Sequence, residues 1–259
     1  MALKIIVCFF AGMGAGLGTG FAGLSAAAVI SPMLISFLGI PAYQAVGIAL
    51  ASDVLASAVS AYTYGKNKNL DLKNGTVMMA CVLLFTAFGS YISSLVEAHA
   101  MGTMSTVMTM FLGVRFIVRP VMTTKEGMET ALTKKQRLIR SIIGGAMIGF
   151  ICGFVGAGGG MMMLLVLTSI LGYELKTAVG TSVFIMAFTA FTGSVSHFAI
   201  GKSVGDIAVL VLCVVFTFVF AQIAAKIANK ASAKTLNRIT GVILVVIGAV
   251  TVAFNLFSK

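Results

Sequence analysis

The sequence predicts an all-α polytopic membrane protein made of two inverted-topology repeats, each of about five helical segments, the second of each five short or re-entrant. The first supporting observation is composition: 59% of the 259 residues are hydrophobic and only 10% are charged, too few charges for a soluble domain of this length. The second is that apolar segments fill nearly the whole chain. The third is an internal repeat, because residues 12–47 align without a gap with residues 145–180.

Glycines at four-residue intervals mark the first segment of each copy of the repeat. They are Gly12, Gly16 and Gly20 in the first copy and Gly145, Gly149 and Gly153 in the second. Such small-residue faces let two membrane helices approach closely. We expect the first segments of the two repeats to pack near the pseudo-symmetry axis.

The apolar segments divide into five per half. They are expected at 4–22, 26–39, 43–64, 74–96, 99–118, 138–155, 160–172, 176–199, 205–228 and 235–257. The second segment of each half has about a dozen residues, roughly 18 Å of helix, which is too short for a hydrocarbon core of about 30 Å. Whether it completes a crossing or returns as a re-entrant hairpin is left open. The domains are a first transmembrane repeat (1–118), a cytoplasmic linker (119–137) and a second transmembrane repeat (138–259).

Basic residues concentrate in the loops 65–73, 115–140 and 226–238. By the positive-inside rule these loops face the cytoplasm, so the linker is cytoplasmic and both termini are external. The net charge of +11 is then a topology signal beside anionic lipid, and nucleic acid is not an expected partner. The expected location is the cell inner membrane, with multiple passes.

Each repeat contains a break between its first two segments, at 23–25 and at 156–160. A helix that begins inside the membrane has unpaired N–H groups and a positive dipole end, which favour an anion. Glycine lets a ligand approach the backbone. The alternative is that Ser25 merely caps its helix and the glycines relieve crowding. We expect the two breaks to face each other near the midplane.

The predicted substrate-binding residues lie at the two breaks and on the third segment of each repeat. They are Gly23, Leu24, Ser25, Gln44, Ser52, Gly156, Gly158, Gly159, Gly160, Thr181 and Ser182. Hydroxyl groups suit an oxyanion because they donate hydrogen bonds without the permanent hold of a fixed cation.

Asp53 is the one acid well inside an apolar segment. A carboxylate there costs about 2.5–3.5 kcal/mol on insertion scales, so it has a buried partner or a function. Asp53 is the predicted coupling residue, with protons or Na⁺ as candidate coupling ions. The alternative is that it only bonds to neighbouring serine hydroxyls.

No enzyme signature, cofactor motif or metal-ligand spacing occurs, and the four cysteines lie singly in apolar segments. The expected partners are therefore a small anionic substrate and the lipid bilayer, and a homo-oligomer is left open.

The second copy, Gly153-Phe154-Val155-Gly156-Ala157-Gly158-Gly159-Gly160 with Lys176-Thr177-Ala178-Val179-Gly180-Thr181-Ser182, resembles the TauE/SafE sulfite-exporter family. Gly20–Gly23, Pro32, Gly39 and Ala45-Val46-Gly47 resemble the family's first repeat. The resemblance implies a bacterial or archaeal inner-membrane carrier of sulfite, organosulfonates or related small anions. Leu24-Ser25-Ala26-Ala27 stands where the family usually has a glycine cluster.

These observations predict a secondary transporter of a small oxyanion, with sulfite or an organosulfonate favoured, working by alternating access around a midplane site between inverted repeats. The alternatives are an anion channel and a non-transporting membrane scaffold.

Overall fold

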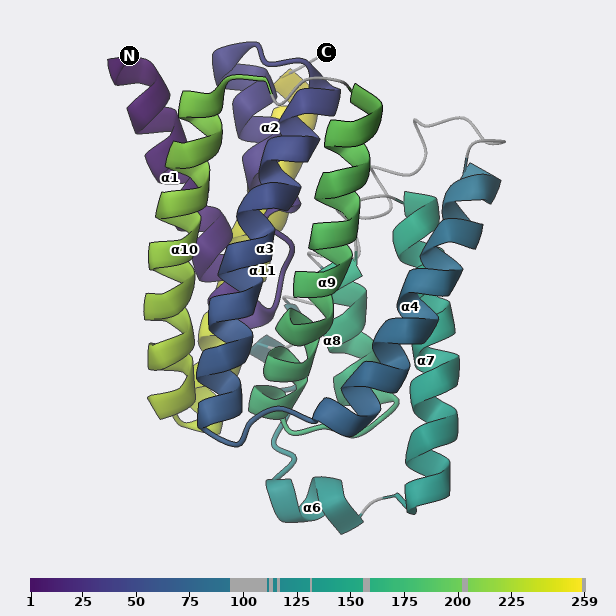
Figure 1. Cartoon of the computed structure of the whole chain (residues 1–259). Helices are drawn as coiled ribbons and strands as arrows, with labels where there is room; N and C mark the ends of the chain where they lie inside the picture. The colour runs from purple at the N-terminus through teal and green to yellow at the C-terminus, as the bar shows by residue number, and fades with distance from the viewer. Residues whose placement is uncertain are drawn as a thin grey trace.

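The computed structural model describes residues 1–93, 111, 114–115, 117–130, 132–155, 159–201 and 205–257, and within them all regular structure is helical. The helices are α1 (Ala2–Ala22), α2 (Ala27–Leu38), α3 (Ala42–Lys66), α4 (Leu72–Ser93), α6 (Lys125–Thr130), α7 (Lys134–Val155), α8 (Gly159–Ser169), α9 (Leu175–Gly201), α10 (Ile207–Lys230) and α11 (Ala233–Phe257) (Figure 1). The predicted all-α class is confirmed. The predicted segment 99–118 lies almost wholly outside the described residues.

The outer surface of the bundle suits a lipid environment. Within the described residues, four helices are long and apolar enough to cross a membrane: Ala2–Ala22, Gln44–Lys66, Leu175–Val195 and Ile207–Lys230. Large apolar side chains such as Leu84, Phe191 and Val211 point outward with more than half of their surface exposed. A soluble protein rarely exposes so continuous an apolar surface, so this is a multi-pass membrane protein.

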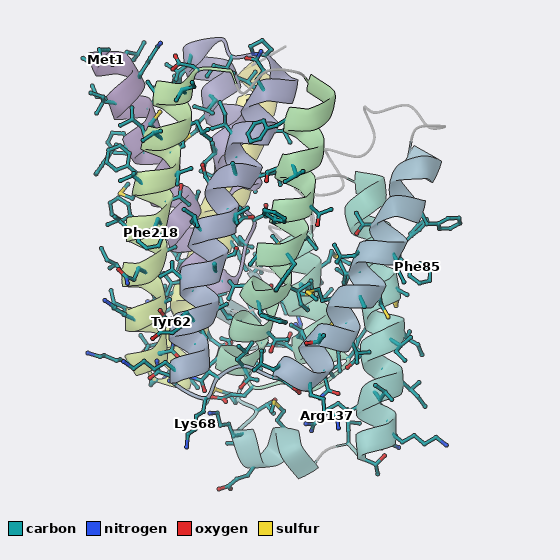
Figure 2. All side chains as sticks on the ribbon, viewed as in Figure 1. Met1, Tyr62, Lys68, Phe85, Arg137 and Phe218 are labelled. Carbon is teal, nitrogen blue, oxygen red and sulfur yellow. The ribbon has the colours of Figure 1, made fainter. Side chains whose placement is uncertain are left out.

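The bundle has two distinct ends. Helix α1 begins and α11 ends at one of them, called here the terminal end (Figure 1). The short helix α6 lies at the opposite end, called here the linker end, where Figure 2 also places the basic side chains of Lys68 and Arg137. An ion pair of 2.5 Å between Lys4 Nζ and Asp206 Oδ2 holds the start of α1 to the start of α10 at the terminal end. The Lys4 hydrogen bond, helped by the Val209 N–H, lowers the pKa of Asp206.

Helix α2 returns towards the end from which α1 came (Figure 1). Lys4, in the first turn of α1, bonds to Asp206, and Gln44, in the first turn of α3, lies against the adjacent Gly205. The chain therefore leaves α2 at the terminal end, and α1 and α2 form a helical hairpin whose two ends lie on the same side.

Helices α7 and α8 form a second hairpin that enters from the linker end. Arg140, near the start of α7, donates a hydrogen bond of 2.9 Å to the carbonyl of Ile170, just beyond the end of α8. The two hairpins thus begin at opposite ends of the bundle, the arrangement that the predicted inverted repeats would give. The repeat relation between the complete halves stays a prediction, because most of 99–118 is not described.

The glycine faces pack tightly, but against partners that the sequence did not indicate. A Cβ atom added at Gly16 would lie 2.6 Å from the Thr217 carbonyl oxygen on α10, and one at Gly149 would lie 2.5 Å from the Val82 carbonyl oxygen on α4. The expected close approach is confirmed. The expectation that the first segments pack together near the axis is wrong, because their glycine faces are filled by backbone of α10 and α4. Helices α3 and α9 pair across the halves instead, as the contact of Gly180 with Tyr64 indicates.

Candidate anion site between the broken helices

The first break begins where α1 ends in a left-handed turn. Gly23 has φ 62°, and its N–H donates to the Thr19 carbonyl over 2.9 Å. Glycine adopts this conformation without a Cβ clash, which is why the helix ends there. The next residue, Leu24, is buried, and its carbonyl accepts a hydrogen bond of 2.8 Å from the Thr19 hydroxyl.

Ser25 supports the start of α2. Its Oγ accepts a hydrogen bond of 3.3 Å from the Ala27 N–H, so the helix-capping role considered from the sequence is real. A hydroxyl that accepts one hydrogen bond still has its own proton to donate. Ser25 is half-buried and its hydroxyl interacts with the carboxylate of Asp53. It therefore caps α2 and contributes a donor to the interior as well.

The start of α8 lies directly on the first break. A Cβ atom at Gly160 would sit 2.5 Å from the Gly23 carbonyl oxygen and 3.0 Å from Leu24 Cα, so only glycine permits this approach. Ser182 of α9 donates a hydrogen bond of 3.1 Å to the same Gly23 carbonyl. Gly159 begins α8, whereas Gly156 and Gly158 lie outside the described residues. The described part of the second half thus meets the first break through Gly160 and Ser182.

Asp53 on α3 is fully buried and points at the beginning of α2. Its Oδ1 accepts a hydrogen bond of 2.8 Å from the Ser57 hydroxyl. The Ser25 hydroxyl and the Ala26 backbone N–H also face this carboxylate. Its second oxygen, Oδ2, has no hydrogen bond of standard geometry within the described part of the chain. A buried carboxyl group with a free oxygen beside a helix start is an unusual and costly arrangement.

The sequence of this chain matches a known protein family over nearly its whole length. Residues 8–251 match the family model for the sulfite exporter TauE/SafE. The chain belongs to the TauE/SafE family. The family consists of membrane transporters rather than enzymes, and the match spans both breaks, Asp53 and the linker.

Full-length relatives agree with this TauE/SafE assignment. The chain is 25% identical to the probable membrane transporter protein YunE of Bacillus subtilis, over 99% of this chain and 100% of the relative. It is also 25% identical to the probable membrane transporter protein YdhB of Bacillus subtilis, over 88% of this chain and 90% of the relative. A probable membrane transporter of Methanocaldococcus jannaschii is 27% identical over 76% of this chain and 72% of the relative. No solved structure matches the chain.

Three of the predicted site residues in this TauE/SafE chain lie apart from the breaks or bond elsewhere. Gln44 is half-buried beside Gly205 at the terminal end, nine residues from Asp53 and about 13 Å along α3. Thr181 is buried and accepts a hydrogen bond of 3.2 Å from the Asp71 N–H at the linker end. The Ser52 hydroxyl donates to the Ile48 carbonyl of its own helix over 2.8 Å. The structure therefore gathers Gly23, Leu24, Ser25, Asp53, Gly160 and Ser182.

Sequence reasoning missed the hydroxyl groups that close the end of α1. Four carbonyls there each accept a hydrogen bond from a buried side chain: Gly20 from Tyr64 (2.9 Å), Phe21 from Thr240 (3.1 Å), Gly23 from Ser182 (3.1 Å) and Leu24 from Thr19 (2.8 Å). Only Ser182 was predicted. The other three lie on different helices, and a lone hydroxyl in an apolar segment gives no sequence signal of its role. The negative end of α1 is thus satisfied by protein, whereas the positive end of α2 faces a carboxylate.

Within the described residues the gathered group lies in the interior. Every gathered residue except Ser25 is buried. A shallow open pocket of about 470 Å³ lies elsewhere, at the linker end of α3, lined by Ala61, Tyr62, Gly65, Lys66, Leu70 and Phe184. It shares no residue with the gathered group, and within the described residues no cluster of three metal-ligating side chains occurs.

Proposed function

We propose that this TauE/SafE protein is a secondary transporter of a small oxyanion, with sulfite or an organosulfonate as the favoured substrate. The proposal joins the membrane-transporter family to the chemistry of the gathered residues. It places the substrate at the start of α2, between the two helical hairpins, and moves it by alternating access.

The observation that carries the proposal is the buried beginning of α2. The Ser25 hydroxyl and the Ala26 N–H point into the interior at the positive end of a helix. These donors match the oxygen atoms of sulfite or of a sulfonate group. The surrounding residues Gly23, Ala26 and Gly160 are small, which suits a compact anionic head group.

Alternating access requires contacts between the halves that form and break. At the linker end, Asn69 Nδ2 donates to Asn229 Oδ1 over 2.6 Å, and Tyr173 OH donates to Asp71 Oδ2 over 2.7 Å. At the terminal end, the Lys4–Asp206 ion pair also joins the two halves. Both sets are polar and replaceable by water, so each can open while the other stays closed. We assign the linker end to the cytoplasm because its loops are basic.

The test is flux into proteoliposomes containing the purified protein. We expect saturable uptake of sulfite or of a sulfonate such as sulfoacetate or taurine, little uptake of acetate, and faster uptake with an inward proton gradient. Empty liposomes are the control. Absence of flux for every sulfur oxyanion would refute the proposal and favour the scaffold, whereas a steady conductance above carrier rates would favour the channel.

A further inference from the structure

The start of α2 already has an anion in front of it. Among the groups that face the Asp53 carboxylate are the Ser25 hydroxyl and the Ala26 N–H, the same donors that a substrate oxyanion would use. Asp53 is 0% exposed, and its Oδ2 is left without a hydrogen bond in the described part of the molecule. Most buried polar atoms in folded proteins are hydrogen-bonded, so an unpaired oxygen on a buried carboxylate asks for an explanation other than stability.

We propose that Asp53 is a resident anion at the start of α2, which a substrate anion replaces only when Asp53 takes up a proton. This inference rests on the proposed function and states its coupling: one proton moves with each substrate anion. The proton comes from water on the side of entry and remains on Asp53 while the substrate is bound. On release, Asp53 loses the proton and returns to the two donors.

The electrostatic reason is that the site cannot hold two negative charges. Two anions about 4 Å apart repel by about 4 kcal/mol even at an effective dielectric constant of 20, so the second anion binds only after the first is neutralised. A protonated Asp53 also gains an O–H donor, which can turn towards the bound oxyanion. The same residue thus excludes the substrate when ionised and assists it when neutral.

The charges around Asp53 leave the proton as the means of neutralising it. On α3 it is faced by Ser57, and at the start of α2 by Ser25 and Ala26. In the described parts of α1, α9 and α10, which also pack against α3, no charged side chain faces it. The side chain of His197 on α9 is not among those described, so His197 is included as a control below.

The carbonyls at the end of α1 argue against Na⁺ as the coupling ion. In broken-helix transporters such carbonyls coordinate the sodium ion. Here Gly20, Phe21, Gly23 and Leu24 already accept hydroxyl hydrogen bonds, as described above. The carbonyl oxygens at the end of α1 are therefore already hydrogen-bonded, and a sodium ion there would have to displace the hydroxyl donors.

The experiment measures anion binding to the purified full-length protein across a pH series, with sulfite and methanesulfonate as probes. Methanesulfonate stays a monoanion throughout the series, so its pH dependence belongs to the protein. In the wild type we expect Kd to rise about tenfold per pH unit once Asp53 is ionised, which is the linkage of one proton. In Asp53→Asn we expect tight binding at every pH, because the amide is a permanently neutral donor.

Infrared difference spectroscopy gives a second, independent measurement. Adding the anion to the wild type should produce a carboxylic-acid C=O band, and Asp53→Asn should lack it. Glu126→Gln, an acid-to-amide change on exposed α6, and His197→Gln should keep both the pH slope and the band. Replacing Na⁺ by choline should change nothing.

The possible results separate this inference from the proposed function. If the wild type binds neither anion at any pH, the proposed function fails and the inference fails with it. If the wild type binds but Asp53→Asn keeps the pH slope or the band, only the inference is overturned. Loss of the slope in His197→Gln, or a requirement for Na⁺, would also overturn it.

Discussion

At the scale of single residues, Gly160 is where the second half meets the first break. Its Cα carries no side chain, and the space where one would begin is filled by the Gly23 carbonyl oxygen and Leu24 Cα. Both neighbours are backbone atoms, so they cannot move aside by changing rotamer. A single methyl group at this position must separate the two breaks.

We therefore expect Gly160→Ala to lower transport more than about tenfold while the protein still folds. Overpacking of this kind costs about 1–3 kcal/mol, and about 1.4 kcal/mol corresponds to a tenfold change. The measurement is proteoliposome flux per amount of monodisperse protein. Gly14→Ala is the matched control, because its Cβ would meet only the movable Val29 side chain, at 3.2 Å. Equal loss in both variants would contradict this account of Gly160.

The sequence predicted a site residue best where its residue type is rare in apolar segments. Asp53 is conspicuous as an intramembrane acid, and Ser25 as a hydroxyl at a helix break, and the structure places them together. Gln44 was chosen because it is polar, but it lies beside Gly205 at the terminal end. Thr181 is the neighbour of Ser182 on α9, but its hydroxyl accepts a hydrogen bond from the Asp71 N–H instead of facing the first break. Polarity alone fixes neither the depth of a residue along a helix nor the face on which it lies. The geometry of the second break remains a prediction for Gly156 and Gly158.

At the scale of elements, each glycine-faced helix is held by one partner from the other half. The face of α1 fits α10, and the face of α7 fits α4. Periodicity predicted nearly every helix and the shortness of α2 and α8. It could not predict that the short helices return, since length excludes a full crossing without giving a direction. It also could not identify the partner helix, because any smooth backbone can fill a glycine face.

Gly16→Val should destabilise the protein by about 1–3 kcal/mol, because its branched side chain meets the backbone of α10. The added Cβ would be 2.6 Å from the Thr217 carbonyl oxygen and 2.7 Å from the Ala221 nitrogen. Thermal unfolding in detergent measures the effect as a lower Tm. Ala80→Val on the exposed face of α4 is the control and should leave the Tm nearly unchanged; an unchanged Tm in Gly16→Val would disprove the close contact.

At the scale of the whole molecule, polar links join the halves at both ends, and the hydroxyl groups of Ser182 and Thr240 join them at the first break. The linker segment also makes polar contacts at the linker end. Asn237 of α11 accepts a hydrogen bond of 2.7 Å from the Val121 N–H and donates one of 2.8 Å to the Val121 carbonyl. The linker thus joins the two halves along the chain and is also hydrogen-bonded to α11 of the second half.

The orientation of the molecule is tested by single-cysteine labelling after the native cysteines are replaced. We expect a membrane-impermeant maleimide to label Pro41→Cys on intact cells and to label Thr133→Cys only after the cells are permeabilised. Both positions are exposed, one at the terminal end and one at the linker end. Labelling of Thr133→Cys from outside would reverse the topology.

The contact between Gly160 and Gly23 also has a consequence for how such a carrier can change its cargo. Where a passage is narrowed by side chains, trimming one of them widens it. Here main chain meets main chain, so no substitution at these two positions can widen the gap between the two breaks. A descendant of this protein with more room between the breaks would have to shorten or tilt a hairpin tip, a change of loop length rather than of residue type.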